Sequence, residues 1–276
     1  MIPMETLTIR GVRNINRSLI IYLVLGVFGL VVTYFTLQLI PYLDELTDPT
    51  VTPDPEVMEK FLPLIPSACG LVIVAIFGII LFLLGFWAMY RGRDEYGEPH
   101  RKDIDRAMLL FMVIVVVIII EIGISVATSV IGLGAVSSTA TSSAFQIVTL
   151  ALGVISSLLI ALFLFYLIKT FIPEEKSNLI ILAVGLFSVA PIASLVSSAW
   201  FSPPSDLTGI TFDPVWMIPG IISTLLSSIA LILFILLYNQ VHHRLKRHEI
   251  KPIWQQTIPG IAQQPQEMRW QPPPPG

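Results

Sequence analysis

The chain has 276 residues, of which 54% are hydrophobic and only 13% are charged, and its formal net charge is −3. Soluble domains of similar hydrophobicity carry roughly 25% charged residues. The composition therefore excludes an ordinary soluble globular protein and indicates a protein that lies in a lipid bilayer. The one cysteine, Cys69, excludes a disulfide framework and a cysteine metal cluster.

Six apolar segments are long enough to cross the hydrocarbon core of a bilayer, which takes about 20 helical residues. They cover residues 18–40, 67–90, 107–131, 145–169, 178–200 and 219–238. The first segment is longer than a signal-peptide core, and no small-x-small cleavage site precedes Pro41. We therefore expect an all-α bundle of six transmembrane helices that keeps its first segment as an anchor.

Lys and Arg residues predict the orientation of this bundle. When the loops are assigned alternately to the two sides of the membrane, all 16 Lys and Arg residues except Lys60 fall on the side of both termini. Lys and Arg accumulate on the cytoplasmic side of membrane proteins. We therefore expect cytoplasmic termini, with residues 1–17 as an N-terminal segment, 18–240 as the membrane domain and 241–276 as a tail.

The tail begins with a basic run and continues into a segment rich in Pro and Gln. Basic residues just beyond a membrane helix are attracted to anionic lipid by about 1 kcal/mol each. We therefore expect anionic lipid headgroups near Arg244, Lys246 and Arg247. The rest of the tail is expected to be an extended, solvating segment, and docking of its PPPP run into an aromatic groove of a partner is the alternative.

Most Ser and Thr residues within the spans lie in the halves farther from the termini. These include Thr33, Thr36, Ser125, Thr128, Ser156, Ser157, Ser194, Ser197, Ser198, Ser223, Thr224, Ser227 and Ser228. Helices in lipid associate through small residues and through hydrogen bonds between side chains. We therefore predict that the outer halves pack tightly, and that the bulky inner halves spread apart or face lipid.

Glu121 stands alone as a carboxylate inside the run VIVVVIIIEIGIS. At helical spacing it shares a face with Ser125 and Thr128, and we take these residues as a candidate intramembrane polar cluster. An ionised carboxylate near the bilayer centre costs on the order of 3 kcal/mol. One interpretation is a protonated acid bonded to a neighbouring hydroxyl, which we favour because no Lys, Arg, His or Asp lies deep in any span. The other is a group that binds a cation or relays protons.

Motifs for catalysis are missing from the sequence. The four histidines His100, His242, His243 and His248 lie outside the spans, so paired histidines for haem are not expected within the membrane. Neither HExxH nor GxSxG occurs. Asp103 and Asp105 resemble a paired-acid metal site, but we expect them to cap the third helix. We predict a protein without catalytic activity, cofactor or metal, and without a nucleic-acid surface.

Two short stretches, RGVRNINRS before the first span and EYG after the second, resemble an uncharacterised family of archaeal multi-pass integral membrane proteins that often end in Pro-rich tails. The resemblance implies an archaeal plasma membrane. The family has no known activity and provides no binding residues to transfer to this chain.

Two functional hypotheses follow from the sequence. The favoured one is a structural or accessory subunit, or a scaffold, that contacts other membrane subunits in an assembly. The alternative is a small-solute or ion transporter or channel that uses Glu121 in an outer-facing polar cavity.

Overall fold

The computed structural model describes residues 6–39, 64–134, 139–200 and 218–255. It contains six helices that are long and apolar enough to cross a membrane. They are α1 (Leu7–Leu39), α4 (Leu64–Arg91), α5 (Glu98–Gly134), α6 (Thr139–Ile168), α7 (Ser177–Trp200) and α8 (Ile218–Lys246). Short 3-10 helices follow α6 and α8: η2 (Lys169–Phe171), η3 (Glu174–Lys176) and η6 (Ile253–Gln255). The predicted all-α architecture with six membrane-spanning helices is confirmed.

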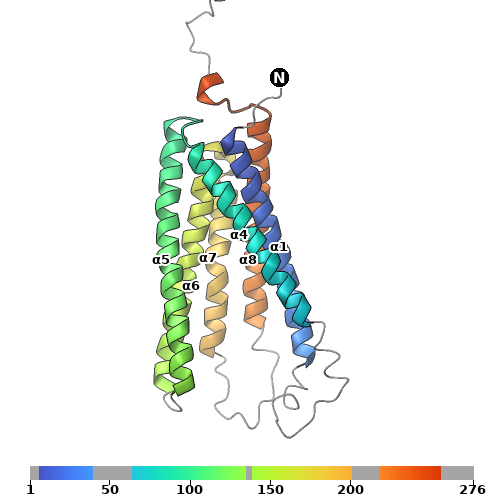
Figure 1. The fold of residues 1–276 in the computed structure, drawn as a ribbon, viewed down its shortest axis with the longest axis vertical. Coiled ribbons are helices and arrows are strands. Elements are labelled where there is room, and N and C mark those ends of the chain that lie inside the picture. The colour runs from blue at the N-terminus through green and yellow to red at the C-terminus, as the bar shows by residue number, and fades with distance from the viewer. Residues whose placement is uncertain (1–5, 40–63, 135–138, 201–217, 256–276) are drawn as a thin grey trace, which may run out of the picture.

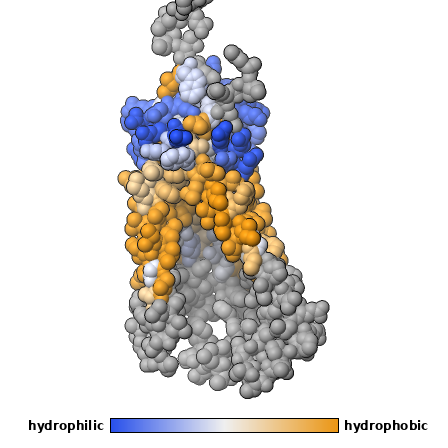
Figure 2. Space-filling model, in the orientation of Figure 1, coloured by the Kyte–Doolittle hydropathy of each residue, from blue (hydrophilic) through white to orange (hydrophobic). Residues whose placement is uncertain are grey.

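The helices form an arc in which each packs against its neighbour, in the order α4, α1, α8, α7, α6, α5. Along the helix axes, the first turn of α1 and the last turn of α8 lie at the same end of the bundle (Figure 1). Hydrophilic side chains gather at this end, which we call the charged end, and an apolar band lies below it (Figure 2). The opposite end is called the far end. α4 and α5 diverge from their connecting loop toward the far end (Figure 1).

The first and last helices extend beyond their apolar segments at the charged end. α1 begins at Leu7 rather than near residue 18, and α8 continues to Lys246 rather than ending near residue 238. The residues predicted as an N-terminal segment and as the start of a tail are therefore largely helical. The polar ends of these helices lie outside the apolar band. Their backbone groups form hydrogen bonds there with other segments of the chain.

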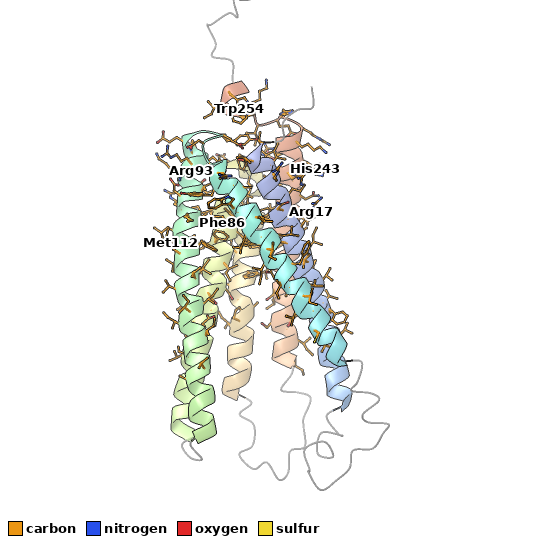
Figure 3. All side chains as sticks on the ribbon, viewed as in Figure 1. Arg17, Phe86, Arg93, Met112, His243 and Trp254 are labelled. Atoms are coloured by element: carbon orange, nitrogen blue, oxygen red, sulfur yellow. The ribbon has the colours of Figure 1, made fainter. Side chains whose placement is uncertain are left out.

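The packed core lies near the charged end. The largest fully buried side chains are Tyr238, Phe163, Phe171, Phe234, Ile15, Met89, Ile104, Leu164, Leu167, Ile168, Leu245 and His100. Phe163 of α6 contacts Phe86 of α4 and Phe111 of α5, with ring centroids 5.2 Å and 6.0 Å away. Phe86 also lies 5.0 Å from Phe111, in the charged-end half of the bundle (Figure 3). These aromatic rings join α4 to α5 and α6 above the level where the helices diverge.

Glycines allow α1 and α4 to approach closely in the same half. A Cβ atom on Gly85 would lie 2.7 Å from Ile15 Cγ1 and 3.0 Å from the Gly11 carbonyl oxygen. A Cβ atom on Gly11 would meet the Met89 side chain and would lie 2.8 Å from the Gly85 carbonyl oxygen. Neither position has room for a larger residue. Ser18 adds a hydrogen bond across the pair, because its hydroxyl donates to the Gly78 carbonyl oxygen at 2.8 Å.

Among the described residues, the buried core lies in the charged-end half rather than in the outer halves that we predicted to pack tightly. Seven of the hydroxyl residues behind that prediction have side chains that lie outside the described residues: Thr33, Thr36, Ser125, Thr128, Ser194, Ser197 and Ser198. Two of the described outer-half hydroxyls donate within their own helix: Thr224 to the Gly220 carbonyl oxygen at 2.9 Å and Ser228 to the Thr224 carbonyl oxygen at 2.8 Å. A hydroxyl bonded to the carbonyl oxygen one turn earlier needs no neighbouring helix. These hydrogen bonds therefore do not join one helix to another, whereas the glycines and aromatic rings of the charged-end half form contacts between helices.

Candidate functional site

The first turn of α1 is capped by a residue from a distant part of the chain. The backbone N–H groups of Leu7 and Thr8 donate to the two carboxylate oxygens of Glu95, each at 3.0 Å. The Ile9 N–H donates to Thr6 Oγ1 at 3.3 Å. The first N–H groups of a helix have no partner inside the helix, and a carboxylate also complements the positive end of the helix dipole. Glu95 therefore holds the α4–α5 loop on the start of α1.

The EYG stretch contributes all three of its residues to this junction. The Tyr96 hydroxyl lies 3.3 Å from Thr6 Oγ1, and Gly97 has a φ of +96°, a conformation that glycine adopts without steric cost. Ile253 N–H donates to the Glu95 carbonyl oxygen at 2.9 Å. The EYG stretch therefore lies against Thr6, Leu7 and Thr8 at the start of α1.

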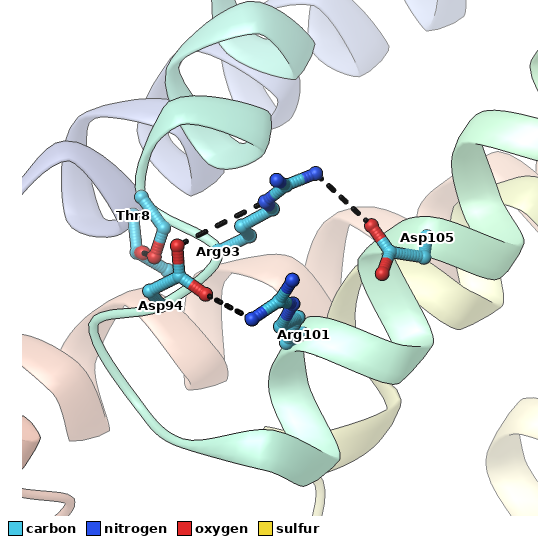
Figure 4. Close-up of polar contacts among 6 residues, drawn as sticks. Thr8, Arg93, Asp94, Arg101 and Asp105 are labelled. Atoms are coloured by element: carbon cyan, nitrogen blue, oxygen red, sulfur yellow. Dashed lines mark hydrogen bonds and ion pairs between the residues drawn. The ribbon is translucent and has the colours of Figure 1, made fainter.

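Ion pairs connect the same loop to α5. Arg93 Nη1 lies 3.3 Å from Asp105 Oδ1, and Arg101 Nη1 lies 3.6 Å from Asp94 Oδ1 (Figure 4). Arg93 Nε lies 3.9 Å from Asp94 Oδ2. These side chains are partly exposed, so each pair contributes at most about 1 kcal/mol. Their effect is to fix the turn between α4 and α5 rather than to form a pocket.

The predicted cap of the third transmembrane helix by Asp103 and Asp105 is wrong. α5 begins at Glu98, which places both aspartates beyond its first turn. Asp105 pairs with Arg93, and Asp103 accepts a hydrogen bond from Thr170 Oγ1 at 2.8 Å. Both acids therefore tie α5 to neighbouring segments instead of capping it.

The chain turns back over the charged end after α8. His248 has a φ of +55°, its N–H donates to the Leu245 carbonyl oxygen, and the Glu249 N–H donates to that of Arg244, both at 3.1 Å. This pair of bonds around a left-handed residue is the Schellman motif that ends many helices. The following residues lead to η6, and Trp254 lies above the charged end with 62% exposure (Figure 3).

Arg244 is one of the three basic residues predicted to contact anionic lipid. Its Nη1 donates to the Phe171 carbonyl oxygen at 2.7 Å, and its Nε lies 3.2 Å from Glu249 Oε2. The guanidinium therefore joins α8 to the end of η2 and to the return segment. Lys246 and Arg247 are exposed, so lipid contact at those two residues stays a prediction.

His100 is a buried titratable group at the charged end. It is 1% exposed, and within the described residues its Nε2 has no hydrogen-bond partner. Its ring centroid lies 4.7 Å from Phe171 and 5.9 Å from Tyr96. Burial lowers the pKa of His100 to about 4, although the carboxylate of Asp94 acts in the opposite direction. His100 belongs to the first turns of α5, above the apolar part that starts at Ala107.

The Glu95 cap gives a first testable prediction. We expect Glu95→Ala to lower the free energy of unfolding by about 1–2 kcal/mol, because two N–H groups at the start of α1 lose their acceptor. Unfolding of the purified protein in detergent micelles measures this change. Glu98→Ala is the matched control, since Glu98 is exposed and pairs with Lys102 in its own helix at 2.6 Å. Equal losses in the two variants would contradict the capping role.

Glu121 lies in the far half of α5 and is partly buried. Its Oε1 is buried and has no hydrogen-bond partner among the described residues. α5 is continuous from Glu98 to Gly134, so Glu121 shares a helix face with Ser125 and Thr128 by spacing. The side chains of Ser125 and Thr128 lie outside the described residues. Whether these three side chains form a cluster therefore stays a prediction.

The described residues define a membrane-spanning six-helix protein whose charged end is tied together by a capped helix, a buried histidine and a returning C-terminal segment. Comparison with known proteins adds no relative: no protein-family model, no curated protein and no solved structure matches the chain.

Proposed function

We propose that this protein is a non-catalytic component of a membrane assembly, a scaffold or accessory subunit whose far half receives the helices of other membrane subunits. The observation that supports this function is the set of far-half glycines that no described residue covers. At the charged end, neighbouring atoms lie too close to leave room for a Cβ atom on Gly11, Gly85 or Gly92. Among the described residues, nothing lies within 4 Å of a Cβ atom built on Gly70, Gly123, Gly153 or Gly220 in the far half.

Small residues matter in lipid because helices there associate by close packing rather than by hiding apolar surface from water. A glycine that faces no neighbouring helix gains nothing from the close approach that its small size permits. It also disfavours the helix by about 1 kcal/mol relative to alanine. A partner helix at these positions would recover the lost packing. The proposal includes the archaeal plasma membrane and the archaeal family that RGVRNINRS and EYG suggest.

Extraction from the native membrane tests this proposal. We expect the protein, solubilised in a mild detergent at its natural abundance, to migrate on a native gel together with other membrane polypeptides. Its apparent size should exceed that of a monomer or a homo-oligomer. Migration as a monomer or as a homo-oligomer under the same conditions would contradict the proposal.

A substitution at an open glycine gives the corresponding prediction for a single residue. We expect Gly123→Leu to lower the amount of protein that migrates in the larger complex by at least tenfold, because the added side chain enters space that the partner occupies. The melting temperature of the isolated protein should stay unchanged. Gly185→Leu is the control. Gly185 is also open but lies in the charged-end half of α7, so the complex should survive. Loss of the complex in both variants would contradict a contact confined to the far half.

Transport is the second candidate function, and Glu121 is the observation that favours it. A buried carboxylate oxygen without a partner inside a membrane protein is a hypothesis for ion or proton passage. Proteoliposomes with an internal pH-sensitive dye test it after an external acid jump. A transporter would acidify the interior at a rate that Glu121→Gln abolishes. Equal rates for the wild type, Glu121→Gln and empty liposomes would exclude proton passage.

A further inference from the structure

Two cations from adjacent helices converge on one aromatic ring at the charged end. Arg106 Cζ of α5 lies 5.8 Å from the ring centroid of Tyr166 in α6. Lys169 Nζ, at the start of η2, lies 5.4 Å from the same centroid. Cations at this distance are attracted to the negative face of an aromatic ring. The ring therefore helps to hold two like charges close to each other.

A buried acid lies beside the two cations. Asp103 is 7% exposed, and its Oδ1 lies 3.6 Å from Arg106 Nη1 and 3.9 Å from Lys169 Nζ. Its Oδ2 accepts the hydrogen bond from Thr170. Two positive charges and one negative charge leave a net charge of one positive unit in this group. Because a guanidinium carries five N–H donors and an ammonium three, most donors remain available to an added anion.

The position of the group fits a lipid molecule better than a soluble anion. The Arg106 and Lys169 side chains are 58% and 43% exposed. Directly toward the membrane, Leu109 and Met112 of α5 are 63% and 57% exposed, so an apolar surface begins one turn below Arg106. The group thus stands one helical turn from an exposed apolar surface. Figure 2 shows that the hydrophilic end of the molecule borders the apolar band directly. A lipid phosphate lies at such a boundary while its acyl chains lie along the apolar side chains.

We propose that Arg106, Lys169 and Tyr166 bind the phosphodiester headgroup of an anionic membrane phospholipid. A phosphodiester carries one negative charge, which matches the net charge of the group with Asp103 included. Basic pockets between membrane helices bind anionic headgroups in this way. This site differs from the predicted contacts at the end of α8, where Arg244 already binds Phe171 and Glu249, and it does not depend on the proposed assembly.

Native mass spectrometry of the full-length protein in neutral detergent tests the site, with phosphatidylglycerol and phosphatidylcholine as probes. We expect the double substitution Arg106→Gln and Lys169→Gln to weaken binding of phosphatidylglycerol by about 10- to 30-fold, at about 1 kcal/mol per basic residue, and to leave binding of phosphatidylcholine unchanged. Arg101→Gln with Lys102→Gln is the control. It removes the same charge from side chains that are 55% and 64% exposed, and it should weaken binding less than about threefold.

Asp103→Asn tests the same site with the opposite sign. An Asn side chain still accepts the hydrogen bond from Thr170 but no longer neutralises a cation, so we expect binding of phosphatidylglycerol to strengthen several-fold. Equal weakening in the double variant and its control, or weaker binding in Asp103→Asn, would overturn the proposal. Competition by millimolar inorganic phosphate would overturn the assignment to a lipid. Unchanged melting temperatures show that the variants are folded, and if the double variant unfolds, the Asp103→Asn result decides.

Discussion

Alanine at Gly85 is expected to lower the free energy of unfolding by about 1–3 kcal/mol, the usual cost of overfilling a packed interface. The added methyl group would lie 2.7 Å from Ile15 Cγ1, and backbone atoms of Gly11 and Ile15 lie only 3.0 Å away. Backbone atoms cannot rotate aside as a side chain can, so α1 and α4 must separate. We expect the destabilisation caused by Gly85→Leu to exceed the stability of the bundle, so this variant should not fold.

Unfolding titrations in micelles measure the change, and Gly185→Ala provides the matched control. Gly185 lies in the same half of the bundle, but nothing is within 4 Å of its Cβ position among the described residues. The same substitution there should leave the stability unchanged or raise it by up to about 1 kcal/mol through helix propensity. A Gly85→Ala variant as stable as Gly185→Ala would show that α1 and α4 do not meet at this glycine.

Acid is expected to destabilise the charged end through His100. The pKa of His100 is about 4 in the folded protein because burial disfavours the charged ring, whereas an exposed histidine has a pKa of about 6.5. Between these two values the unfolded state binds the proton and the folded state does not. The stability is therefore complete above about pH 6.5 and falls as the pH drops to about 4, by about 3 kcal/mol in total.

His100→Phe separates this effect from the titration of carboxylates. Phenylalanine keeps a ring beside Phe171 and Tyr96 but takes up no proton. The difference in unfolding free energy between wild type and His100→Phe should change by about 3 kcal/mol between pH 7 and pH 4, with the wild type losing more. Parallel pH profiles for the two proteins would show that His100 is not buried in its neutral form.

The number of helices was predictable because the length of each apolar segment can be read directly from the sequence and compared with the thickness of the bilayer. Hydropathy decides whether a segment enters lipid, and the distribution of Lys and Arg favours an even number of crossings. The start of α1 and the end of α8 were not predictable in the same way, since both lie outside the apolar segments. They are helical because Glu95, far away in the sequence, caps Leu7 and Thr8, and because Arg244 and Glu249 form contacts at the end of α8.

The Ser and Thr residues did not point to the core near the charged end, and the reason is physical. Ser and Thr residues are ambiguous in a membrane helix, because the same hydroxyl bonds either to a neighbouring helix or to its own backbone. Thr224 and Ser228 bond to their own backbone. A better signal was present in the sequence: Gly78, Gly85 and Gly92 recur at every seventh residue, the repeat of helices that pack along a seam. Gly11 lies before the apolar run, so hydropathy did not point to it.

The candidate site was only partly predictable. Glu121 was recognisable because a carboxylate in an apolar run is unusual. The environment of His100 was not, since Phe171 and Tyr96 come from separate segments that only the fold brings together. The approach of Arg106 and Lys169 to the same Tyr166 ring likewise requires α5 and α6 to be neighbours.

Photo-crosslinking in native membranes tests the central claim that the protein packs against itself near the charged end and leaves its far half for other membrane subunits. A photoreactive amino acid would replace lipid-facing residues one at a time: Ile122, Val148 and Ile222 in the far half, and Leu109, Ile181 and Leu236 in the charged-end half, all exposed by 43–66%. The account predicts adducts with another polypeptide from the far-half positions, and adducts with lipid alone from the other three. Polypeptide adducts only from the charged-end half, or equally from both halves, would contradict it.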